Sequence, residues 1–348
     1  MKIGVDISPI VYGSGVSVYL DNLFDQVLKV DTKNQYQFFF SSLRRSQGKF
    51  PAKSFKIPPR ILDWIWNRFH VLPIESLIGP VDVFHASDWT QPPAKKAKLV
   101  TTIHDLSFLR WPETVHPRVL AAQKKRLEWV EKEADAVIAV SQATKDEILS
   151  LLKIPEKKIF VVHEALPQDV VKPEKKGDLS QYGIRGNYLF AYGSQAPRKN
   201  IGQLLKAFGK VRKNIDCQLV ISGGYQGPDL PGVIYAGFVS RPLVLTFLSQ
   251  ASAFIYPSLY EGFGLPILEA FYLETPVVTS NCSSMKEVAG QAAVLVDPLS
   301  VDSIARGIKQ ALGNREKLLL AGKKRLKNFS WQTAAEKTVK IYQNLHGN

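Results

Sequence analysis

The chain has 348 residues, which is enough for about two domains, each with a sizeable core. Hydrophobic residues make up 45% of it and charged residues 22%, as in soluble globular proteins, and no apolar run approaches the roughly 18 to 20 residues that a membrane span needs. The formal net charge of +14 raises the question of an anionic partner, but no nucleic-acid motif accompanies it, so we expect no nucleic acid partner.

The basic excess is spread along the chain. Residues 1–166 carry 23 Lys and Arg against 18 Asp and Glu, and residues 167–348 carry 22 against 13. The local clusters are Lys95, Lys96 and Lys98; Lys124, Lys125 and Arg126; and Lys323, Lys324, Arg325 and Lys327. Each cluster fits a solvated face, and attraction to an anionic lipid or an anionic acceptor is the alternative.

The beginning of the chain and its two cysteines predict a cytoplasmic protein. The start MKIGVDISPI lacks the basic region and long apolar stretch of a secretory signal, and it is typical of a first strand. Cys217 and Cys282 have no metal-type spacing, so we expect reduced thiols. Peripheral contact with the inner face of the plasma membrane is the alternative that the basic clusters leave open.

A strand, a glycine loop and a helix open the chain. Ile3–Ile7 is predicted to be a strand, Gly13 and Gly15 lie in the loop, and an amphipathic helix is predicted from about Val16 to Val30. Backbone N–H groups at such a helix start can hold a diphosphate or a sugar, although a plain tight turn uses the same residues. A second strand is predicted at Gln37–Phe40.

The segment before the next strand, Asp82–His85, has two interpretations. Arg44–Phe55 is predicted to be a polar loop, and RILDWIWNRFHVLPIESLI, residues 60–78, is predicted to be helical. This second segment mixes Trp64 and Trp66 with basic residues. We expect the tryptophans to pack under the sheet, and a membrane-surface helix is the alternative.

Candidate chemistry follows the apolar strand Leu99–Ile103, where His104 and Asp105 come next. Residues at the carboxyl end of a strand face the ligand in α/β sheets, and an imidazole can donate to a sugar hydroxyl or to a departing phosphate. A core histidine bonded to a neighbouring carbonyl is the alternative for His104. Asp105 suits either an acceptor contact or the structure of the loop.

The first domain is predicted to end in further alternating elements. A helix at Val119–Ala134 and a strand at Ala136–Val140 are followed by Ser141, which we expect to cap the next helix rather than to act in catalysis. A last short strand lies within Pro155–Val162. The stretch Pro167–Asp178 has linker composition and marks the domain boundary.

The α/β alternation restarts with the strand Tyr188–Tyr192. Arg198, Lys199 and Asn200 come directly before a predicted helix, Ile201–Val211. Two adjacent cations at a helix start can grip a pyrophosphate, Arg as a fork and Lys as a point charge, although basic residues are also common on any surface. Further strands are predicted at Gln218–Gly223 and Val233–Ala236.

The stretch from Tyr256 to Gly290 lies at the centre of the predicted site. Apolar strands are predicted at Ala251–Ile255 and Pro276–Thr279. Between them, Gly264 allows a tight turn and Pro266 suits a first helical position, so a helix is predicted to begin near Leu265.

Two carboxylates flank this predicted helix start. Glu261 lies in the preceding loop, and Glu269 is expected in the first turn, so both are predicted at the ligand-binding end of the sheet. There they can accept hydrogen bonds from the hydroxyls of a phosphorylated sugar. Two solvated glutamates beside an ordinary turn are the alternative. The remaining predicted elements are the strand Val294–Val296 and the helices Ser303–Leu312 and Trp331–Leu345.

The run PSLYEGFGLPILEAFYLETPVV resembles the E-x7-E signature of the retaining, nucleotide-sugar-dependent glycosyltransferases of family 4. The chain is most similar to the bacterial mannosyl- and hexosyltransferases of that family, which build surface polysaccharides. The resemblance covers nearly the whole chain, because GSGVSVYL, TTIHDLSFLRWPE, AVSQATKDEI, YGSQAPRKNIGQLLKAF, VLVDP and FSW follow in the order of the family.

This resemblance implies the GT-B fold, in which two Rossmann-like, doubly wound parallel-sheet domains of the α/β class face a central cleft. Residues 1–166 would form the acceptor-side domain, with the terminal helix 331–348 packed back on it. Residues 167–186 would be the linker, and residues 187–330 the domain that binds the nucleotide sugar.

The resemblance also assigns roles to residues. The catalytic set would be Glu261, His104, Arg198 and Lys199. The donor would be bound by Gly13, Gly15, Arg198, Lys199, Val239, Gly264, Leu265 and Glu269. Other branches of the family carry an extra arginine where this chain has Ser194, so the phosphate grip is expected to depend more on Arg198 and Lys199.

We therefore expect a retaining glycosyltransferase that moves a hexose from a nucleotide-diphosphate sugar to a hydroxyl of a saccharide or lipid-linked saccharide. GDP-mannose is favoured as donor, and a UDP-hexose is the alternative. No Asp-x-Asp pair is present, so we expect no metal and no further cofactor. The alternative functions are a nucleotide-sugar epimerase, a phosphorylase, a glycosidase that uses Glu261 and Glu269, and a non-catalytic protein that binds polyanions or membranes.

Overall fold

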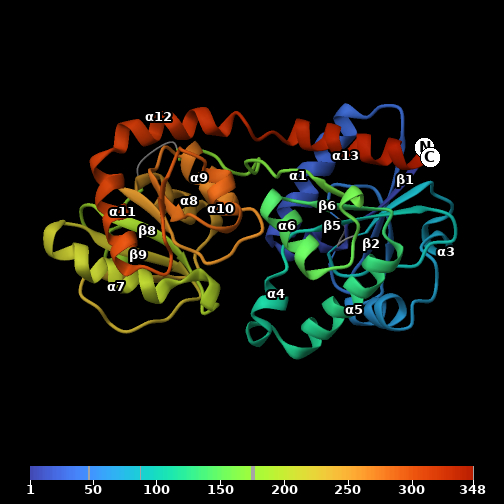
Figure 1. Ribbon diagram of the computed structural model, residues 1–348, viewed down its shortest axis with the longest axis horizontal. Coiled ribbons are helices and arrows are strands. Elements are labelled where there is room, and N and C mark those ends of the chain that lie inside the picture. The colour runs from blue at the N-terminus through green and yellow to red at the C-terminus, as the bar shows by residue number, and fades with distance from the viewer. Residues whose placement is uncertain (46–47, 87, 174–176, 348) are drawn as a thin grey trace. The chain divides into compact units, whose positions relative to one another are not determined.

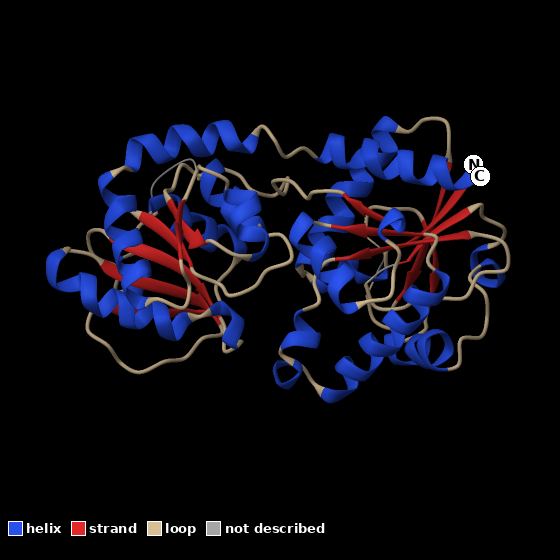
Figure 2. Cartoon of the chain, in the orientation of Figure 1, coloured by secondary structure: helices blue, strands red, loops and turns tan. Residues whose placement is uncertain are grey.

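The chain forms two units, each built on its own parallel β-sheet with helices on both faces (Figures 1 and 2). Unit 1 consists of Met1–Glu164 and Ser330–Asn348, and unit 2 of Ala165–Phe329. The structure is a computed structural model, and it describes residues 1–348 except 46–47, 87, 174–176 and 348. Part of the predicted linker therefore lies outside the described residues. None of the described helices combines the length and the apolarity needed to cross a membrane.

The sheet of unit 1 has the strand order β3-β2-β1-β4-β5-β6-β7, and every pair of neighbours is parallel. The order reverses between β1 and β4, and ligands bind at the carboxyl ends of the strands around such a point. The strands are β1 (Lys2–Asp6), β2 (Gln35–Ser41), β3 (Ala52–Phe55), β4 (Val83–Ala86), β5 (Lys98–Ile103), β6 (Ala136–Ala139) and β7 (Ile159–Val161).

The helices of unit 1 include one from the far end of the chain. In this unit α13 (Trp331–His346) packs beside α1 (Gly15–Val30), where the ring centroids of Tyr19 and Trp331 lie 6.0 Å apart. The other helices are α2 (Pro59–Leu62), the π-helix η2 (Asp63–Arg68), α3 (Glu75–Ile78), α4 (Ser107–Arg110), α5 (Pro117–Glu133) and α6 (Gln142–Leu151).

Unit 2 repeats the same arrangement with six parallel strands in the order β10-β9-β8-β11-β12-β13. Its order reverses between β8 and β11. The strands are β8 (Tyr188–Gly193), β9 (Gln218–Gly223), β10 (Val233–Gly237), β11 (Ala253–Tyr256), β12 (Val277–Ser280) and β13 (Val294–Val296). The helices are α7 (Ile201–Val211), α8 (Arg241–Gln250), α9 (Leu265–Tyr272), α10 (Ser283–Ala289), α11 (Val301–Gly313) and α12 (Arg315–Leu326).

The core of unit 2 forms because its helices present apolar residues at helical spacing to apolar strands. In α7, Leu204, Phe208 and Val211 are all buried against the sheet. In α11, Gly307 lets the helix lie close to the strands, since a Cβ there would be 2.4 Å from Cγ1 of Val296. The two α/β lobes predicted from the sequence are thus confirmed.

Two predictions for unit 1 were wrong. The end of the predicted polar loop Arg44–Phe55 forms strand β3, an edge strand that pairs with β2; residues 46–47 of that loop lie outside the described residues. The predicted helix over residues 60–78 is broken into α2, η2 and α3. Leu72 adopts a left-handed φ of 63° before Pro73, since proline disfavours the helical conformation in the residue before it.

The tryptophans on this broken segment also differ from each other. Trp66 is fully buried and donates to the carbonyl of Leu72 over 3.0 Å, whereas Trp64 is 52% exposed. Our expectation that both pack under the sheet is therefore correct for Trp66 and wrong for Trp64.

Candidate active site

The candidate site of unit 2 lies where the strand order of its sheet reverses. The loop after β8 carries Arg198 and Lys199, and the loop after the neighbouring strand β11 carries Glu261. Because β8 and β11 are parallel, both loops leave the same edge of the sheet. This edge is where doubly wound sheets bind their ligands.

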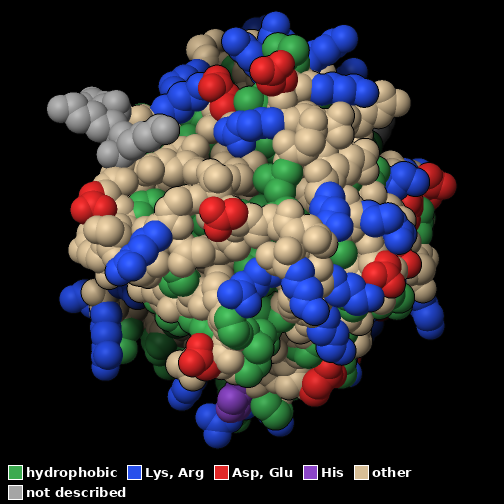
Figure 3. All heavy atoms as spheres, turned by 90° about the vertical axis from the view of Figure 1, so that its left-hand side faces the viewer, with side chains coloured by type: hydrophobic (Ala, Val, Ile, Leu, Met, Phe, Trp, Pro, Cys, Tyr) green, Lys and Arg blue, Asp and Glu red, His purple; other side chains and the backbone are tan. Residues whose placement is uncertain are grey.

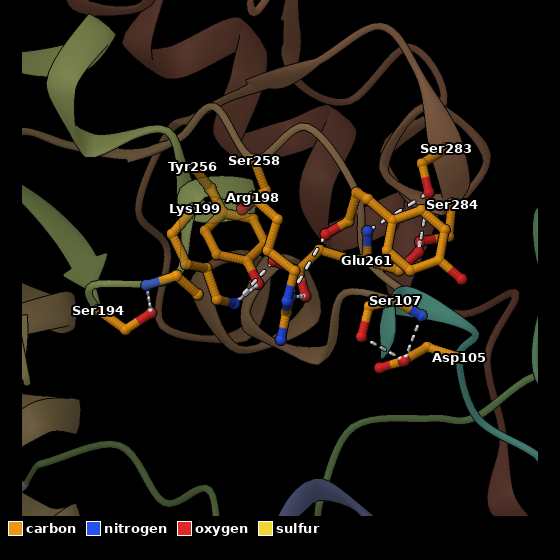
Figure 4. A network of polar contacts seen from close by, with 12 residues as sticks. Asp105, Ser107, Ser194, Arg198, Lys199, Tyr256, Ser258, Glu261, Ser283 and Ser284 are labelled. Carbon is orange, nitrogen blue, oxygen red and sulfur yellow. Dashed lines mark hydrogen bonds and ion pairs between the residues drawn. The ribbon is translucent and has the colours of Figure 1, made fainter. Parts of the chain in front are cut away.

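Glu261, Arg198 and Lys199 form one ionic cluster at this edge (Figure 4). Arg198 Nη1 donates to Oε2 of Glu261 over 2.8 Å, and Lys199 Nζ donates to Oε1 over 2.7 Å. Burial alone would raise the pKa of Glu261, but the charges of Lys199 and Arg198 outweigh it and lower the pKa to about 2. The carboxylate is therefore ionised, and the cluster carries one net positive charge.

Hydrogen bonds from the start of α10 hold the loop of Glu261 in place. The hydroxyls of Ser283 and Ser284 donate to the Glu261 carbonyl over 2.8 and 2.7 Å (Figure 4). Asn200, which has a left-handed φ of 59°, donates through Nδ2 to the carbonyls of Pro257 and Pro298. These bonds hold the loops of the cluster in one geometry before any ligand arrives.

Tyr256 completes the surroundings of Lys199. The Lys199 ammonium donates to the Tyr256 hydroxyl over 3.1 Å and lies 5.1 Å from the centre of its ring. Burial and the nearby charge of Glu261 raise the pKa of Tyr256 well above its ordinary value, so the phenol stays neutral. Lys199 therefore supplies positive charge to the cluster, and Tyr256 supplies a neutral polar group beside it.

Glu269 lies elsewhere on α9 than the sequence predicted. The helix begins at Leu265 and Glu269 is its fifth residue, so the carboxylate is not in the first turn. The carboxylate is buried, and Arg241 binds it with two hydrogen bonds, of 2.7 Å to Oε1 and 3.1 Å to Oε2. Tyr192 also donates to Oε2, over 3.3 Å.

The remaining predicted donor contacts of unit 2 lie on two loops. Gly264 has a φ of 103°, a left-handed conformation that favours glycine, and it directly precedes Leu265, the first residue of α9. Val239 is half-buried between β10 and α8, beside Phe238, which is 89% exposed. Gly264 and Leu265 follow the loop of Glu261 directly, and Val239 lies two residues before Arg241, the partner of Glu269.

In unit 1, His104 follows β5 and pairs with a carboxylate. Its Nδ1 is 3.2 Å from Oε1 of Glu164, and its ring lies edge-on to Tyr19 with centroids 4.6 Å apart. Burial alone would lower the pKa of His104, but the hydrogen bond and charge of Glu164 outweigh it and raise the pKa above its ordinary value. The core histidine bonded to a carbonyl, which we kept as the alternative, does not match this carboxylate partner.

The glycine loop and Asp105 have local structural roles. Gly13 has a left-handed φ of 66°, and Gly15 begins α1, whose start is closed by a capping box between Ser14 and Ser17. Asp105 accepts hydrogen bonds from the backbone and the hydroxyl of Ser107 over 2.9 and 2.6 Å (Figure 4). Asp105 therefore serves the loop, the second of its two predicted uses.

Sequence reasoning missed Arg241 and Glu164, the partners of Glu269 and His104. Glu164 comes just after β7, at the carboxyl end of a strand, and this position was the signal that could have identified it. In the part of the chain that the structure describes, no group of three or more His, Cys, Asp or Glu residues could hold a metal ion. Whether catalysis needs a metal stays a prediction.

Comparison with known proteins gives matches over both units. The profile of the family described as "Glycosyl transferases group 1" matches residues 180–330, and that described as "Glycosyltransferase Family 4" matches residues 15–170. O-antigen chain mannosyltransferase B of Escherichia coli is 32% identical over 282 residues, which are 73% of this chain and 72% of that protein. MMP alpha-(1->4)-mannosyltransferase of Mycolicibacterium hassiacum is 26% identical over 62% of this chain and 55% of that protein.

Solved structures share the fold at lower identity. Sucrose-phosphate synthase from Thermosynechococcus elongatus has a TM-score of 0.73 and 17% identity, over 100% of this chain and 99% of that chain. HepE from Anabaena, solved in complex with UDP and glucose, has a TM-score of 0.69 and 15% identity, over 99% and 100%.

Proposed function

Since the chain belongs to the family 4 glycosyltransferases and is a hexosyltransferase with the GT-B fold, we propose that it transfers a hexose from a nucleoside-diphosphate sugar, with retention at the anomeric carbon. The proposed acceptor is a hydroxyl of a saccharide or lipid-linked saccharide. One observation carries the proposal: Arg198, Lys199 and Glu261 form a preorganised cluster where the strand order of unit 2 reverses.

Mannose is the favoured sugar and GDP-mannose the favoured donor. Both relatives described above are named mannosyltransferases, and one of them covers nearly three quarters of the chain at 32% identity. A UDP-hexose is the second candidate, because one protein of the same fold was solved with UDP and glucose.

The proposed chemistry uses the net charge of the cluster. As the sugar leaves, negative charge grows on the diphosphate, and Arg198 and Lys199 are the cations that would stabilise it. Glu261 keeps these cations oriented in the absence of donor, and its ionised oxygens would face the positive charge that develops on the transferred sugar. Glu269, fixed by Arg241, would accept hydrogen bonds from the ribose.

His104 would act as a hydrogen-bond donor. Its raised pKa favours the protonated ring, and Glu164 binds Nδ1, so Nε2 would donate to a hydroxyl of the transferred sugar or to the departing phosphate. Gly13 and Gly15 would contribute backbone N–H groups at the start of α1.

The direct test is incubation of the protein with GDP-mannose or UDP-glucose, with and without saccharide acceptors and EDTA. We expect release of the nucleoside diphosphate together with a glycosylated acceptor, and loss of transfer in Glu261→Ala. Conversion of the donor alone into an isomeric sugar nucleotide would indicate an epimerase. Consumption of inorganic phosphate would indicate a phosphorylase, and wild-type turnover by Glu261→Ala would count against the proposed site.

A further inference from the structure

A hollow with two exposed tryptophans lies at the carboxyl ends of the strands of unit 1. We call it the tryptophan hollow, and the residues that matter here are Trp64, Trp89, Thr90, Arg60, Arg68 and Arg118. Its volume is about 800 Å³, which falls in the range of roughly 300–1,000 Å³ typical of small-molecule sites. Arg60 follows β3 and Trp89 follows β4, so the hollow opens at the edge where α/β sheets bind ligands.

The two indole rings are placed to pack against a ligand. Trp64 is 52% exposed and Trp89 is 39% exposed, whereas Trp66, two positions from Trp64, is fully buried. Large aromatic side chains are normally buried, and those left exposed around a concave surface mark binding sites. The apolar face of a pyranose ring is a flat partner that such indole faces can cover.

The charge of the hollow favours an anion. Within the described part of the chain, Arg60, Arg68 and Arg118 form no ion pair, and the Arg68 guanidinium lies 5.0 Å from the centre of the Trp64 ring. The carboxylate of Asp63, which also lines the hollow, accepts a hydrogen bond from Asn67 over 2.8 Å. The guanidinium groups thus remain available, and a guanidinium fork binds phosphate oxygens in pairs.

The walls of the hollow are held together before any ligand binds. Trp64 and Arg68 lie on the π-helix η2, a rare conformation that occurs often at functional sites. The fully buried Asn67 donates to the carbonyl of Trp89 over 3.0 Å and accepts from the backbone N–H of Gln91 over 3.0 Å. One side chain therefore joins the wall that carries Trp64 to the wall that carries Trp89.

A buried hydroxyl lies in the floor of the hollow. Thr90 is 4% exposed and lines the hollow, and its hydroxyl has no hydrogen-bond partner among the residues that the structure describes. Burying an unpaired hydroxyl is unfavourable, so such a group is a candidate to be satisfied by a ligand. A polar floor beneath aromatic walls suits a sugar better than an acyl chain.

We infer that the tryptophan hollow binds the acceptor through a sugar ring that carries a phosphate or diphosphate: the indoles of Trp64 and Trp89 cover the ring, Thr90 bonds a hydroxyl, and Arg68 and Arg118 bind the phosphate. This inference rests on the proposed glycosyl transfer and adds the chemical class of its acceptor. The competing interpretation is that the same segment binds a membrane surface through the exposed apolar side chains of Phe69 and Val71.

The test measures binding of free mannose, mannose 1-phosphate and an alkyl-diphosphate-linked mannose by calorimetry and tryptophan fluorescence. GDP and UDP are present at saturating concentration, so that the donor site of unit 2 cannot take the probes. We expect the two phosphorylated probes to bind at least tenfold more tightly than mannose. The alkyl-diphosphate probe distinguishes a lipid-linked acceptor, if it binds best, from a soluble phosphosugar.

Variants locate the binding. Trp64→Ala with Trp89→Ala is expected to weaken every probe at least tenfold, and Arg68→Ala with Arg118→Ala to remove the advantage of the phosphorylated probes. Leu149→Ala, on α6, is the control for the loss of an exposed apolar side chain, and Lys29→Ala, on α1, is the control for the loss of an exposed cation; both should bind as wild type. If the double tryptophan variant does not fold, Trp64→Ala alone serves, because half of that side chain is already solvated.

The outcomes separate this inference from the proposed function. Wild-type probe affinity in the tryptophan and arginine variants would overturn the inference. So would a loss of probe affinity in Leu149→Ala equal to that in Trp64→Ala, or binding to anionic vesicles with no binding of any probe, which would indicate a membrane surface. Binding of GDP and UDP by the wild type is measured in parallel: its absence would contradict the proposed donor site, whereas its retention in Trp64→Ala with loss of probe binding supports both proposals.

Discussion

Glu261 is an ionised carboxylate that is almost removed from solvent. Its side chain is 11% exposed, and its charge is stabilised by Lys199 and Arg198 at 2.7 and 2.8 Å. A buried ion cluster of this kind contributes little net stability when it is complete, but removing one partner leaves the others without compensation. The cluster is therefore sensitive to both substitution and pH.

Glu261→Gln is predicted to destabilise unit 2 by about 3–5 kcal/mol, because Arg198 and Lys199 lose their counter-charge. The pKa of Glu261 is lowered from 4.5 to about 2, so its contribution to stability is present above pH 4.5 and is lost as the pH falls toward 2. That contribution is on the order of 3 kcal/mol, from the size of the shift. Urea unfolding between pH 2 and pH 7 measures it.

In that series the wild type should lose stability below pH 4.5 more steeply than Glu261→Gln does. The control is Asp302→Asn, which breaks an exposed ion pair with Lys210 on the same unit and should change stability little. Equal acid sensitivity of wild type and Glu261→Gln would contradict the ionised state of Glu261.

His104 is predicted to set the alkaline limit of activity. Its pKa is raised above 6.5 by the hydrogen bond and charge of Glu164, so the protonated ring persists to higher pH than in a free imidazole and is lost as the pH rises through the raised pKa. Glu164→Gln removes the charge that raises the pKa, and we expect the alkaline limb of kcat/KM to move to lower pH. The same shift applies to stability: the His104–Glu164 contribution is complete below pH 6.5 and declines above it.

The control for this profile is His85, a buried histidine of unit 1. Burial and the charge of His104 lower the pKa of His85 to about 3. His85 therefore stays neutral across the assay range and does not affect the pH profile of kcat/KM. An alkaline limb that is unchanged in Glu164→Gln would contradict the role of His104 as a protonated donor.

Arg241 is predicted to be required for donor affinity through Glu269. Arg241→Lys cannot reproduce the two parallel hydrogen bonds of 2.7 and 3.1 Å, so it should behave much like Arg241→Ala, with donor KM raised about tenfold and kcat less affected. A double-mutant cycle with Glu269→Gln measures the coupling, which we expect to exceed 1 kcal/mol. Full activity of Arg241→Lys, or additive effects in the cycle, would show that the pair does not act as a unit.

The residues of the site differ in how readily the sequence predicts their roles. Arg198, Lys199 and Glu261 were predicted because each lies within a few residues of a strand end, where local pattern is informative. Arg241 could not be predicted, because its role depends on a contact with Glu269 across 28 positions. The start of α9 near Leu265 was predicted correctly, but Glu269 was placed in the wrong turn, because it is the fifth residue of the helix and a turn holds only about 3.6 residues.

At the scale of elements, sequence reasoning succeeded where the apolar periodicity is strong. The bounds of α7 agree with the prediction, since its buried residues recur at helical spacing. Helix α8 was missed because its apolar residues Leu243, Val244, Leu245, Phe247 and Leu248 are nearly adjacent and show no clear helical period. The break at Leu72 was missed because the aromatic residues before it continue a helical pattern.

The close packing of α11 on the sheet gives a prediction for Gly307. A Cβ there would lie 2.4 Å from Val296 Cγ1 and 3.1 Å from Val278 Cγ1, so Gly307→Ala should push the helix from the strands and cost about 1–3 kcal/mol. Gly209, inside α7, has no atom within 4 Å of its Cβ position, so Gly209→Ala should instead stabilise by about 0.5–1 kcal/mol. Chemical denaturation of both variants tests the contrast, and equal effects would contradict it.

At the scale of the whole molecule, two α/β lobes were predictable because strands and helices alternate twice along the chain. The strand order in each sheet was not, since it depends on pairing between strands far apart in sequence, such as β1 with β4. Both sheets reverse at their fourth strand, and some of the candidate residues follow the strands at that point: Gly13 and Gly15 follow β1, Arg198 and Lys199 follow β8, and Glu261 follows β11.

The Lys and Arg residues that give the chain its net charge of +14 are spread over the surface, and some of them have partners within the protein. Lys and Arg side chains occur over the whole face shown in Figure 3, with apolar side chains between them. Members of two predicted basic clusters have specific partners: Arg325 donates to the carbonyl of Val288 over 3.0 Å, and Lys125 donates to Glu128 over 2.7 Å. The Lys125 contact fits a solvated face, whereas Arg126 of the same cluster is 1% exposed and pairs with Asp88 over 3.2 Å, so the expectation of a solvated face is wrong for that residue.

The last helix makes unit 1 discontinuous in sequence, because the chain completes unit 2 before α13 returns. The Tyr342 hydroxyl on α13 lies 2.6 Å from Nδ1 of His85 on β4, and both side chains are buried. Tyr342→Phe leaves the imidazole nitrogen without this partner, which should cost about 1–3 kcal/mol in unit 1. Nucleotide affinity, which we propose for unit 2, should not change even though α13 comes just after unit 2 in the chain.

Calorimetric unfolding with and without saturating GDP separates the two effects, since a ligand raises the melting temperature only of the unit that binds it. We expect Tyr342→Phe to lower the transition that GDP leaves unshifted and to leave the GDP-dependent transition in place. Lys340→Ala, on the exposed face of the same helix, is the matched control and should alter neither. If Tyr342→Phe lowered the GDP-dependent transition instead, α13 would stabilise unit 2, and the assignment of the terminal helix to unit 1 would fail.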